Sequence, residues 1–161
     1  MASADVGYIS IFLQAGGRSS TPTSLTSTSN PSAFGQSLTF TATVSSQGSG
    51  TPTGTVTFTY GSTTLCNAVT LRGGTATCAY SALPVGSDIV TATYSGDNNF
   101  TPSSGTVSQT VNQASTTLTL TSSVNPSGLD SPVTFTATIT PQYGGQATGT
   151  VTFQRWLHDT E

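Results

Sequence analysis

Apolar residues and threonines alternate strictly in several short segments of the chain. Residues 38–44 and 55–60 show this alternation most clearly, residues 90–94 repeat it, and residues 107–111 show a weaker form. A period of two residues is typical of a β-strand with one buried and one solvent-facing side. Turn-forming residues separate these segments at Asn30-Pro31-Ser32, Gly48-Ser49-Gly50, Gly73-Gly74, Pro84-Val85-Gly86 and 96–99. The pattern therefore predicts an all-β fold of short strands.

The number of strands predicts two packed sheets. About seven strands in roughly 90 residues favour an antiparallel β-sandwich, in which the apolar faces of two sheets form a shared core. The residues expected to point into this core are Phe40, Ala42, Phe58, Val90, Ala92 and Val107. A domain of this size buries only about two-thirds of the surface of its unfolded chain, so we expect modest stability unless a cross-link adds to it.

Blocks of sequence recur later in the chain at one constant offset. Residues 39–43 and 134–138 both read TFTAT, which is a shift of 95 residues, and residues 53–58 return as TGTVTF at the same shift. A constant offset is typical of a tandem repeat. We therefore divide the chain into a strand-like segment at 1–20, a complete domain at 21–112, and a partial second repeat with an atypical tail at 113–161.

Two cysteines form a candidate disulfide. Cys66 and Cys78 flank a Gly-Gly turn, and residues 65–71 and 75–80 read as the two arms of a hairpin. A tight turn would place Cys66 opposite Ser81, so a bond requires a longer loop or a bulge. The alternatives are two buried free thiols or two thiols that never meet. We favour the disulfide because the chain has no cluster of metal ligands, and it would imply an oxidising compartment.

Composition narrows the classes of partner. The chain contains 34 threonines and 24 serines, only 6% of its residues are charged, and lysine is absent. Its formal charge is −3, so it has no basic surface to displace counterions from nucleic acid or to bind an anionic membrane. No segment has the apolar length that spans a bilayer. We expect no nucleic-acid partner and no membrane insertion.

Catalytic and metal sites are not expected. The single histidine, His158, lies in the tail near Asp159 and Glu161, and we interpret this group as a solvated terminus. A calcium site would need six or more oxygen ligands, whereas Asp and Asn at 97–99, even with Asp88, more often bind the backbone of their own turn. We predict no catalytic residue, no cofactor and no metal.

Aromatic side chains are the remaining candidates for binding. Tyr60, Tyr80, Tyr143 and Trp156 could stack on sugars or dock a protein, although scattered aromatics on strands more often cover a core or an edge. Tyr94 has two structural interpretations. Its ring could belong to the core with the hydroxyl at the rim, which we favour, or the hydroxyl could fix the neighbouring corner.

Three segments carry a resemblance to a known family. Residues 53–58 (TGTVTF), 83–86 (LPVG) and above all 91–100 (TATYSGDNNF) resemble the bacterial immunoglobulin-like repeats of the group-3 type. The resemblance covers residues 21–112 fully and 114–153 in part. It implies an Ig-like antiparallel β-sandwich, one complete module plus the first half of a second, without enzymatic activity. Such repeats occur in tandem arrays in secreted and cell-surface proteins.

Two segments depart from this family pattern. Residues 154–161 (QRWLHDTE) are unlike the turn and hairpin expected after the last matching strand. Residues 8–13 (YISIFL) are strand-like, belong to no repeat and faintly resemble the closing strand of a propeller blade. They lack the preceding basic residue, the apolar length and the cleavage site of a signal peptide. We infer that secretion is directed by other means or that the chain is a piece of a longer protein.

Two functions from different classes follow. The first is an extracellular or cell-surface spacer, whose partners are neighbouring Ig-like repeats or other subunits. The second is an adhesive module that binds glycans or surface proteins, which a surface cluster of Tyr and Trp would favour. A third hypothesis is a filament, in which residues 8–13 of one subunit pair with the half-module of the next.

Overall fold

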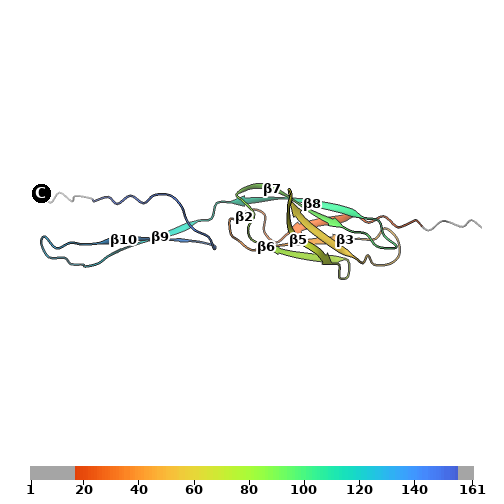
Figure 1. Cartoon of the computed structure of the whole chain (residues 1–161), viewed down its shortest axis with the longest axis horizontal. Coiled ribbons are helices and arrows are strands. Elements are labelled where there is room, and N and C mark those ends of the chain that lie inside the picture. Colours follow the sequence, from red (N-terminus) through yellow and green to blue (C-terminus); the bar gives the residue numbers. More distant parts are fainter. Residues whose placement is uncertain (1–16, 156–161) are drawn as a thin grey trace, which may run out of the picture.

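The computed structural model describes residues 17–155, which form an all-β fold. Eight strands form one sandwich and two more form a smaller C-terminal unit, and the two lie end to end along the long axis (Figure 1). The strands are β1 (Thr23–Ser27), β2 (Ser32–Ala33), β3 (Leu38–Val44), β4 (Thr55–Tyr60), β5 (Thr63–Thr70), β6 (Thr75–Tyr80), β7 (Gly86–Tyr94), β8 (Ser103–Asn112), β9 (Thr116–Ser122) and β10 (Phe135–Pro141).

Several candidates from the sequence lie outside the described residues: the strand-like segment 8–13, Trp156, His158, Asp159 and Glu161. The filament hypothesis depends on the first of these and stays a prediction.

The sandwich consists of two sheets, as the strand pattern predicts. One sheet has the order β1-β3-β6 and the other β2-β8-β7-β4-β5. All neighbouring strands are antiparallel except β2 and β8, where Ser32 pairs with Val111 in a parallel arrangement. The predicted strands 38–44 and 55–60 coincide with β3 and β4. In contrast, β7 and β8 are longer than predicted, because their polar ends pair through the backbone without an alternating apolar pattern.

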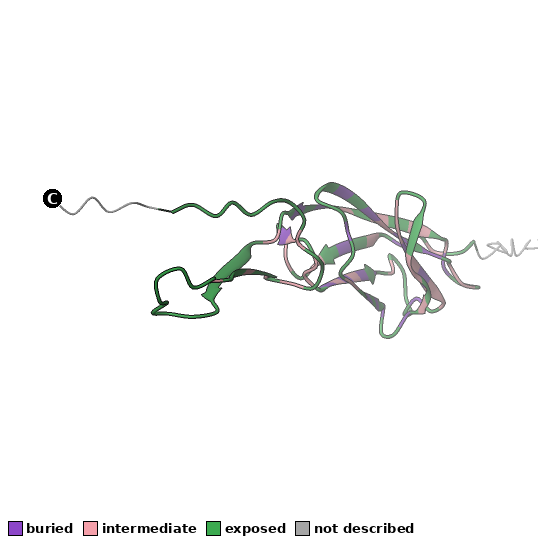
Figure 2. Cartoon of the chain, turned by 60° about the vertical axis from the view of Figure 1, so that its left-hand side comes forward, coloured by how far each residue is buried: buried purple, intermediate pink, exposed green. Residues whose placement is uncertain are grey.

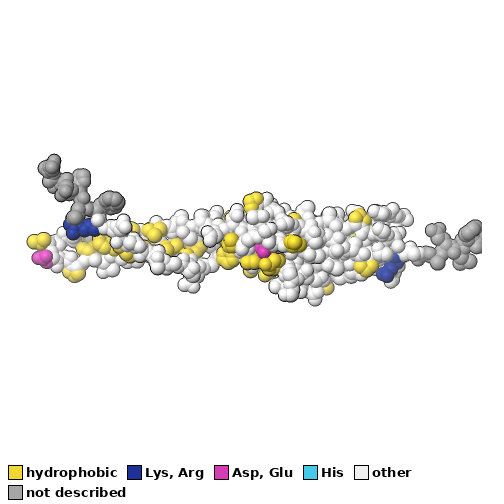
Figure 3. Space-filling model, turned by 90° about the horizontal axis from the view of Figure 1, so that it is seen from above, with side chains coloured by type: hydrophobic (Ala, Val, Ile, Leu, Met, Phe, Trp, Pro, Cys, Tyr) yellow, Lys and Arg dark blue, Asp and Glu magenta, His cyan; other side chains and the backbone are white. Residues whose placement is uncertain are grey.

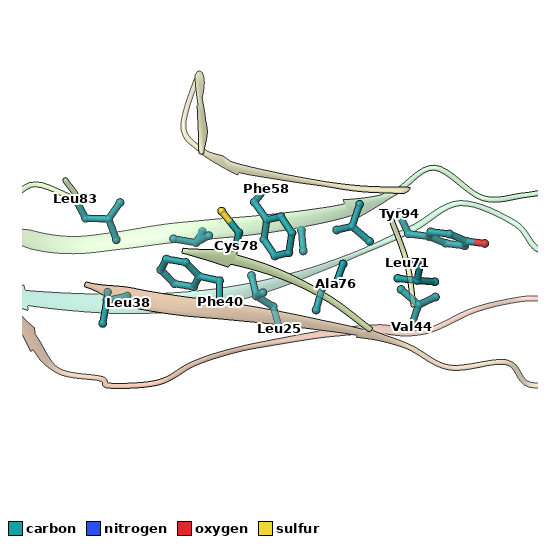
Figure 4. Close-up of a cluster of buried hydrophobic side chains, with 14 of the residues drawn as sticks. Leu25, Leu38, Phe40, Val44, Phe58, Leu71, Ala76, Cys78, Leu83 and Tyr94 are labelled. Atoms are coloured by element: carbon teal, nitrogen blue, oxygen red, sulfur yellow. The ribbon is translucent and has the colours of Figure 1, made fainter. Parts of the chain in front are cut away.

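Alternate residues of both sheets form the core (Figure 4). Phe40, Ala42, Phe58, Val90 and Ala92, all predicted to point inward, are completely buried. Val107, also predicted there, is only partly buried and packs against the margin of the core. The sheets approach closely at Gly105 of β8, where any side chain would collide with the backbone of Thr23 on β1.

The predicted hairpin between residues 65 and 80 is wrong. β5 pairs with β4, whereas β6 pairs with β3, so the two arms belong to opposite sheets. The Gly-Gly turn carries the chain from one sheet to the other. Both glycines have positive φ, and Arg72 and Thr75 form an isolated bridge across the turn.

The disulfide between Cys66 and Cys78 is present and therefore joins the two sheets. A register shift, of the kind expected from a bulge, lies in β5 beside Cys66, where Ala68 adopts a φ of 47°.

The C-terminal unit repeats only part of the sandwich. β9 and β10 pair in the register of β1 and β3, since Leu120 opposes Ala137 as Leu25 opposes Ala42. Its residues are nevertheless almost all exposed (Figure 2). Residues 150–153, which repeat the start of β4, form no strand. In the sandwich β4 pairs with β5 and β7, and the described residues contain no second counterpart of either strand.

The cross-link between the sheets generates the first prediction. Reduction, or replacement of Cys66 and Cys78 by alanine, should lower stability by about 3 kcal/mol, because the disulfide closes a loop with a sequence separation of 12. This corresponds to a decrease in Tm of roughly 10–20 °C, without loss of the fold. Calorimetry of oxidised and reduced protein measures it. Two reactive thiols in the unfolded, unreduced chain would contradict the assignment.

The uncovered C-terminal unit generates the second prediction. Expressed separately, residues 21–112 should unfold cooperatively, whereas residues 113–161 should not, because the apolar side of the β9–β10 pair has no covering sheet. Circular dichroism during thermal unfolding compares the two fragments. A sigmoidal transition of the C-terminal fragment alone would show that the β9–β10 pair is an independent domain.

Candidate functional surfaces

Asp97 organises the loop that joins β7 to β8. The hydroxyl and the amide N–H of Thr53 donate hydrogen bonds of 2.6 and 2.8 Å to its Oδ2, and the amides of Asn99 and Phe100 each donate one of 2.8 Å to its Oδ1. The Thr53 hydroxyl and amide, with smaller contributions from the other two amides, hold the pKa of this carboxyl well below its usual range. The carboxylate therefore ties two loops together in its ionised form.

Tyr94 fixes the same corner from inside. Its ring is fully buried, as predicted, and its hydroxyl donates a 2.6 Å hydrogen bond to the carbonyl of Thr53. Desolvation, together with the nearby charge of Asp97, raises the pKa of the hydroxyl. Both interpretations from the sequence thus hold, because one side chain fills the core and anchors the loop before β4.

The arrangement around Asp97 is that of a turn. Both carboxylate oxygens bind the protein itself, and Asp88 lies near the opposite end of β7, too far along the strand to share an ion with it. Within residues 17–155, no three His, Cys, Asp or Glu side chains gather into a group that could hold a metal.

The candidate binding aromatics come from separate elements. Tyr60 ends β4, Tyr80 ends β6 in the other sheet, and both are partly buried against the core. Tyr143 lies in the loop after β10, and Trp156 is outside the described residues. A binding role for these four side chains stays a prediction.

Two buried polar groups were missed by the sequence analysis. Gln109 on β8 is completely buried: its Oε1 accepts a 2.6 Å hydrogen bond from Ser27, and its Nε2 donates to the Ser29 carbonyl and the Ser32 hydroxyl. It thereby ties β8 to the segment between β1 and β2. A glutamine at an inward position of the alternating strand 107–111 is a signal that could have identified it.

Asp88 on β7 is the second buried polar group. It is 4% exposed, and its Oδ2 has no hydrogen-bond partner among the described residues. The nearby Asp88 carboxylate, together with desolvation, raises the pKa of the Tyr60 hydroxyl. Tyr60 pairs with Val90, two residues along β7 from Asp88, so the two side chains lie at the same end of the five-stranded sheet.

The sandwich and the C-terminal unit make direct contact. Only residues 113–115 separate β8 from β9. Gly35 of the sandwich has a φ of +81°, and a Cβ at this position would lie 2.8 Å from the carbonyl oxygen of Gly144 and 3.1 Å from the Cβ of Tyr143. The position thus requires glycine both for its backbone and for the close approach of the two units.

A hollow of about 280 Å³ lies beside this contact. Apolar side chains from both units line it, and Figure 3 shows apolar groups around the junction as well as along the C-terminal unit. They include Phe34 and Val85 from the sandwich, and Ala114, Pro141 and Ala147 from the other side. In the second repeat, Leu129 and Asp130 occupy the positions of Phe34 and Gly35, and Leu129 is 95% exposed.

The Asp97 network generates the third prediction. Asp97→Asn should lower Tm by several degrees at pH 7, because an amide cannot accept all four hydrogen bonds. The folded pKa is depressed, so the stabilisation is present above the unfolded pKa of about 4 and is lost as the pH falls below it. The difference in Tm should therefore narrow toward about pH 2. Asp130→Asn, at an exposed position, is the matched control; a gap that stays constant down to low pH would contradict the role of Asp97.

Comparison with known families agrees with this geometry. None of the described residues forms a helix that is long and apolar enough to cross a membrane. No curated protein and no solved structure matches the chain. The family model of the bacterial Ig-like domain (group 3) matches residues 25–112, which is more than half of the 161-residue chain and reaches from β1 to the end of β8. The resemblance found in the sequence is confirmed, and the chain belongs to the bacterial Ig-like domain (group 3) family.

Proposed function

We propose that the chain is a non-catalytic spacer in an extracellular or cell-surface protein, in which Ig-like repeats follow one another end to end. Its family supports a structural module, and the disulfide fits an oxidising compartment. Asp97 and Gln109 also support a structural role, since both use their hydrogen bonds to hold loops and strands together.

The junction between the two units carries this proposal. Three connecting residues span at most about 11 Å, so the C-terminal unit stays next to the end of the sandwich at which β8 finishes. The contact of Gly35 with residues 143–144 then restricts how the second unit can tilt. A short connection combined with a direct contact limits the relative motion of the two units, and a spacer requires such a restriction.

The stiffness of this junction is the fourth prediction. Cysteines introduced for spin labels at Ser104 and Thr119, both exposed, should give a narrow distance distribution. Inserting a Gly-Gly-Ser-Gly-Gly-Ser segment after Ala114 should broaden it, because the insertion adds flexible chain between the units.

The matched control places the same insertion in the turn between β4 and β5, away from the junction, where it should leave the distribution narrow. Electron paramagnetic resonance distance measurements compare the three proteins. An unmodified chain whose distribution is as broad as that of the junction insertion would refute the spacer proposal.

A further inference from the structure

The C-terminal unit exposes one continuous apolar surface, which we call the open face. It consists of Leu120, Phe135, Ala137, Val151 and Phe153, and these residues line a groove of about 580 Å³. Leu120, Phe135 and Phe153 are each 55–57% exposed. Figures 2 and 3 show the exposed strands and the apolar side chains along this unit. Large apolar side chains gathered on an exposed surface mark an interaction site.

The internal repeat identifies what covers this kind of surface. At the offset of 95 residues, the open face has the same residues as the core positions Leu25, Phe40, Ala42, Val56 and Phe58 of the sandwich. Those five residues are 0–7% exposed, and they share their core with Val90, Ala92 and Tyr94 of β7. Since β9 and β10 also keep the register of β1 and β3, the open face presents the side chains that β7 meets in the sandwich.

The backbone beside the open face is available for pairing. Residues 150–153 repeat Thr55–Phe58, the part of β4 in which Val56 pairs with Tyr94 and Phe58 with Ala92 of β7. In the C-terminal unit these four residues form no strand. An extended segment with free N–H and C=O groups can accept an added strand, and the alternating side chains then set its register.

A charged residue beside the open face, Arg155, indicates which kind of strand this face would bind. Arg155, which lines the groove, stands at the position of Tyr60. In the sandwich, Tyr60 pairs with Val90 of β7, two residues from Asp88, whose buried Oδ2 has no hydrogen-bond partner among the described residues. A strand added in the register of β7 would bring its own aspartate beside a guanidinium instead of a phenol. An arginine can form a charge-assisted hydrogen bond with that carboxylate.

We propose that the open face binds a polypeptide carrying a hairpin of the β7–β8 type, whose first strand pairs with residues 150–153 and whose aspartate, at the position of Asp88, pairs with Arg155. Partner recognition is then by strand addition, with apolar alternation supplying the affinity and the aspartate supplying selectivity.

The test uses the full chain and a synthetic peptide with the sequence of residues 86–112. The peptide should bind saturably with one copy per chain, and it should protect the amides of residues 150–153 from hydrogen exchange. A peptide with Asp88→Asn should bind about two- to fivefold more weakly, as expected for a partly exposed ion pair. A peptide with Val90→Ser and Ala92→Ser, which keeps the charge but removes the apolar side, should not bind.

A matched variant of the chain separates recognition of the aspartate charge from non-specific hydrophobic binding. Arg155→Tyr restores the residue of the first repeat and should bind the aspartate and asparagine peptides with nearly equal affinity. Three results would overturn the proposal: no binding of the 86–112 peptide, equal binding of both peptides to the unmodified chain, or protection in β4 instead of residues 150–153. A fourth result against the proposal would come from light scattering. If the chain forms a dimer and Phe135→Ser abolishes it, the open face is covered by a second copy of the chain.

Discussion

The fold depends on one constraint, which is that each sheet has a single apolar face. Threonine alternates with apolar residues along β3 and β4, so one side of each sheet faces solvent and the other side must be buried against another sheet. In the sandwich the second sheet supplies that cover, and Phe40 and Phe58 are completely buried. In the C-terminal unit the same residue types, Phe135 and Phe153, stay more than half exposed. Sequence identity at a core position therefore does not ensure burial, because burial is a property of the pair of sheets.

Because each sheet is complete only against its partner, the ties between the sheets determine how rigid the module is. The disulfide joins β5 to β6, and the hydrogen bond between Ser27 and Gln109 joins β1 to β8, so both cross from one sheet to the other. Within the five-stranded sheet, Tyr94 of β7 adds a bond to the loop before β4. These ties use covalent and neutral hydrogen bonds, in keeping with a chain of which only 6% of residues are charged. Such a module holds its shape without networks of surface ion pairs.

Short sequence patterns were sufficient to predict where some strands begin and end, because alternation depends only on neighbouring residues. Alternation located β3 and β4 at their observed limits. The offset of 95 residues also relates the pairing of β9 and β10 to that of β1 and β3, whereas the division into a complete domain and a second repeat stays a prediction. The hairpin through Gly73 failed, because a turn signal shows where the chain reverses but not which sheet the next strand joins. Asp88 and Gly35 could not be interpreted from sequence, since the role of each depends on a residue far away in the chain, Tyr60 for the first and Gly144 for the second.

The direction of the chain through the sandwich determines how it would respond to tension. The chain enters beside β1 at one end of the long axis and leaves through β8 at the other (Figure 1). Hydrogen bonds link Thr23 to Ser103 and Ser27 to Gln109, so β1 and β8 run side by side in the same direction. A pull on both termini therefore slides these strands past each other, and the cross-links between them carry the load together instead of breaking one after another. The disulfide also removes the residues between Cys66 and Cys78 from the length that can be drawn out. Force applied along a chain of such modules would load the bonds between β1 and β8 in shear. In that geometry all of these bonds must break at the same time, so they resist more force than they would one by one.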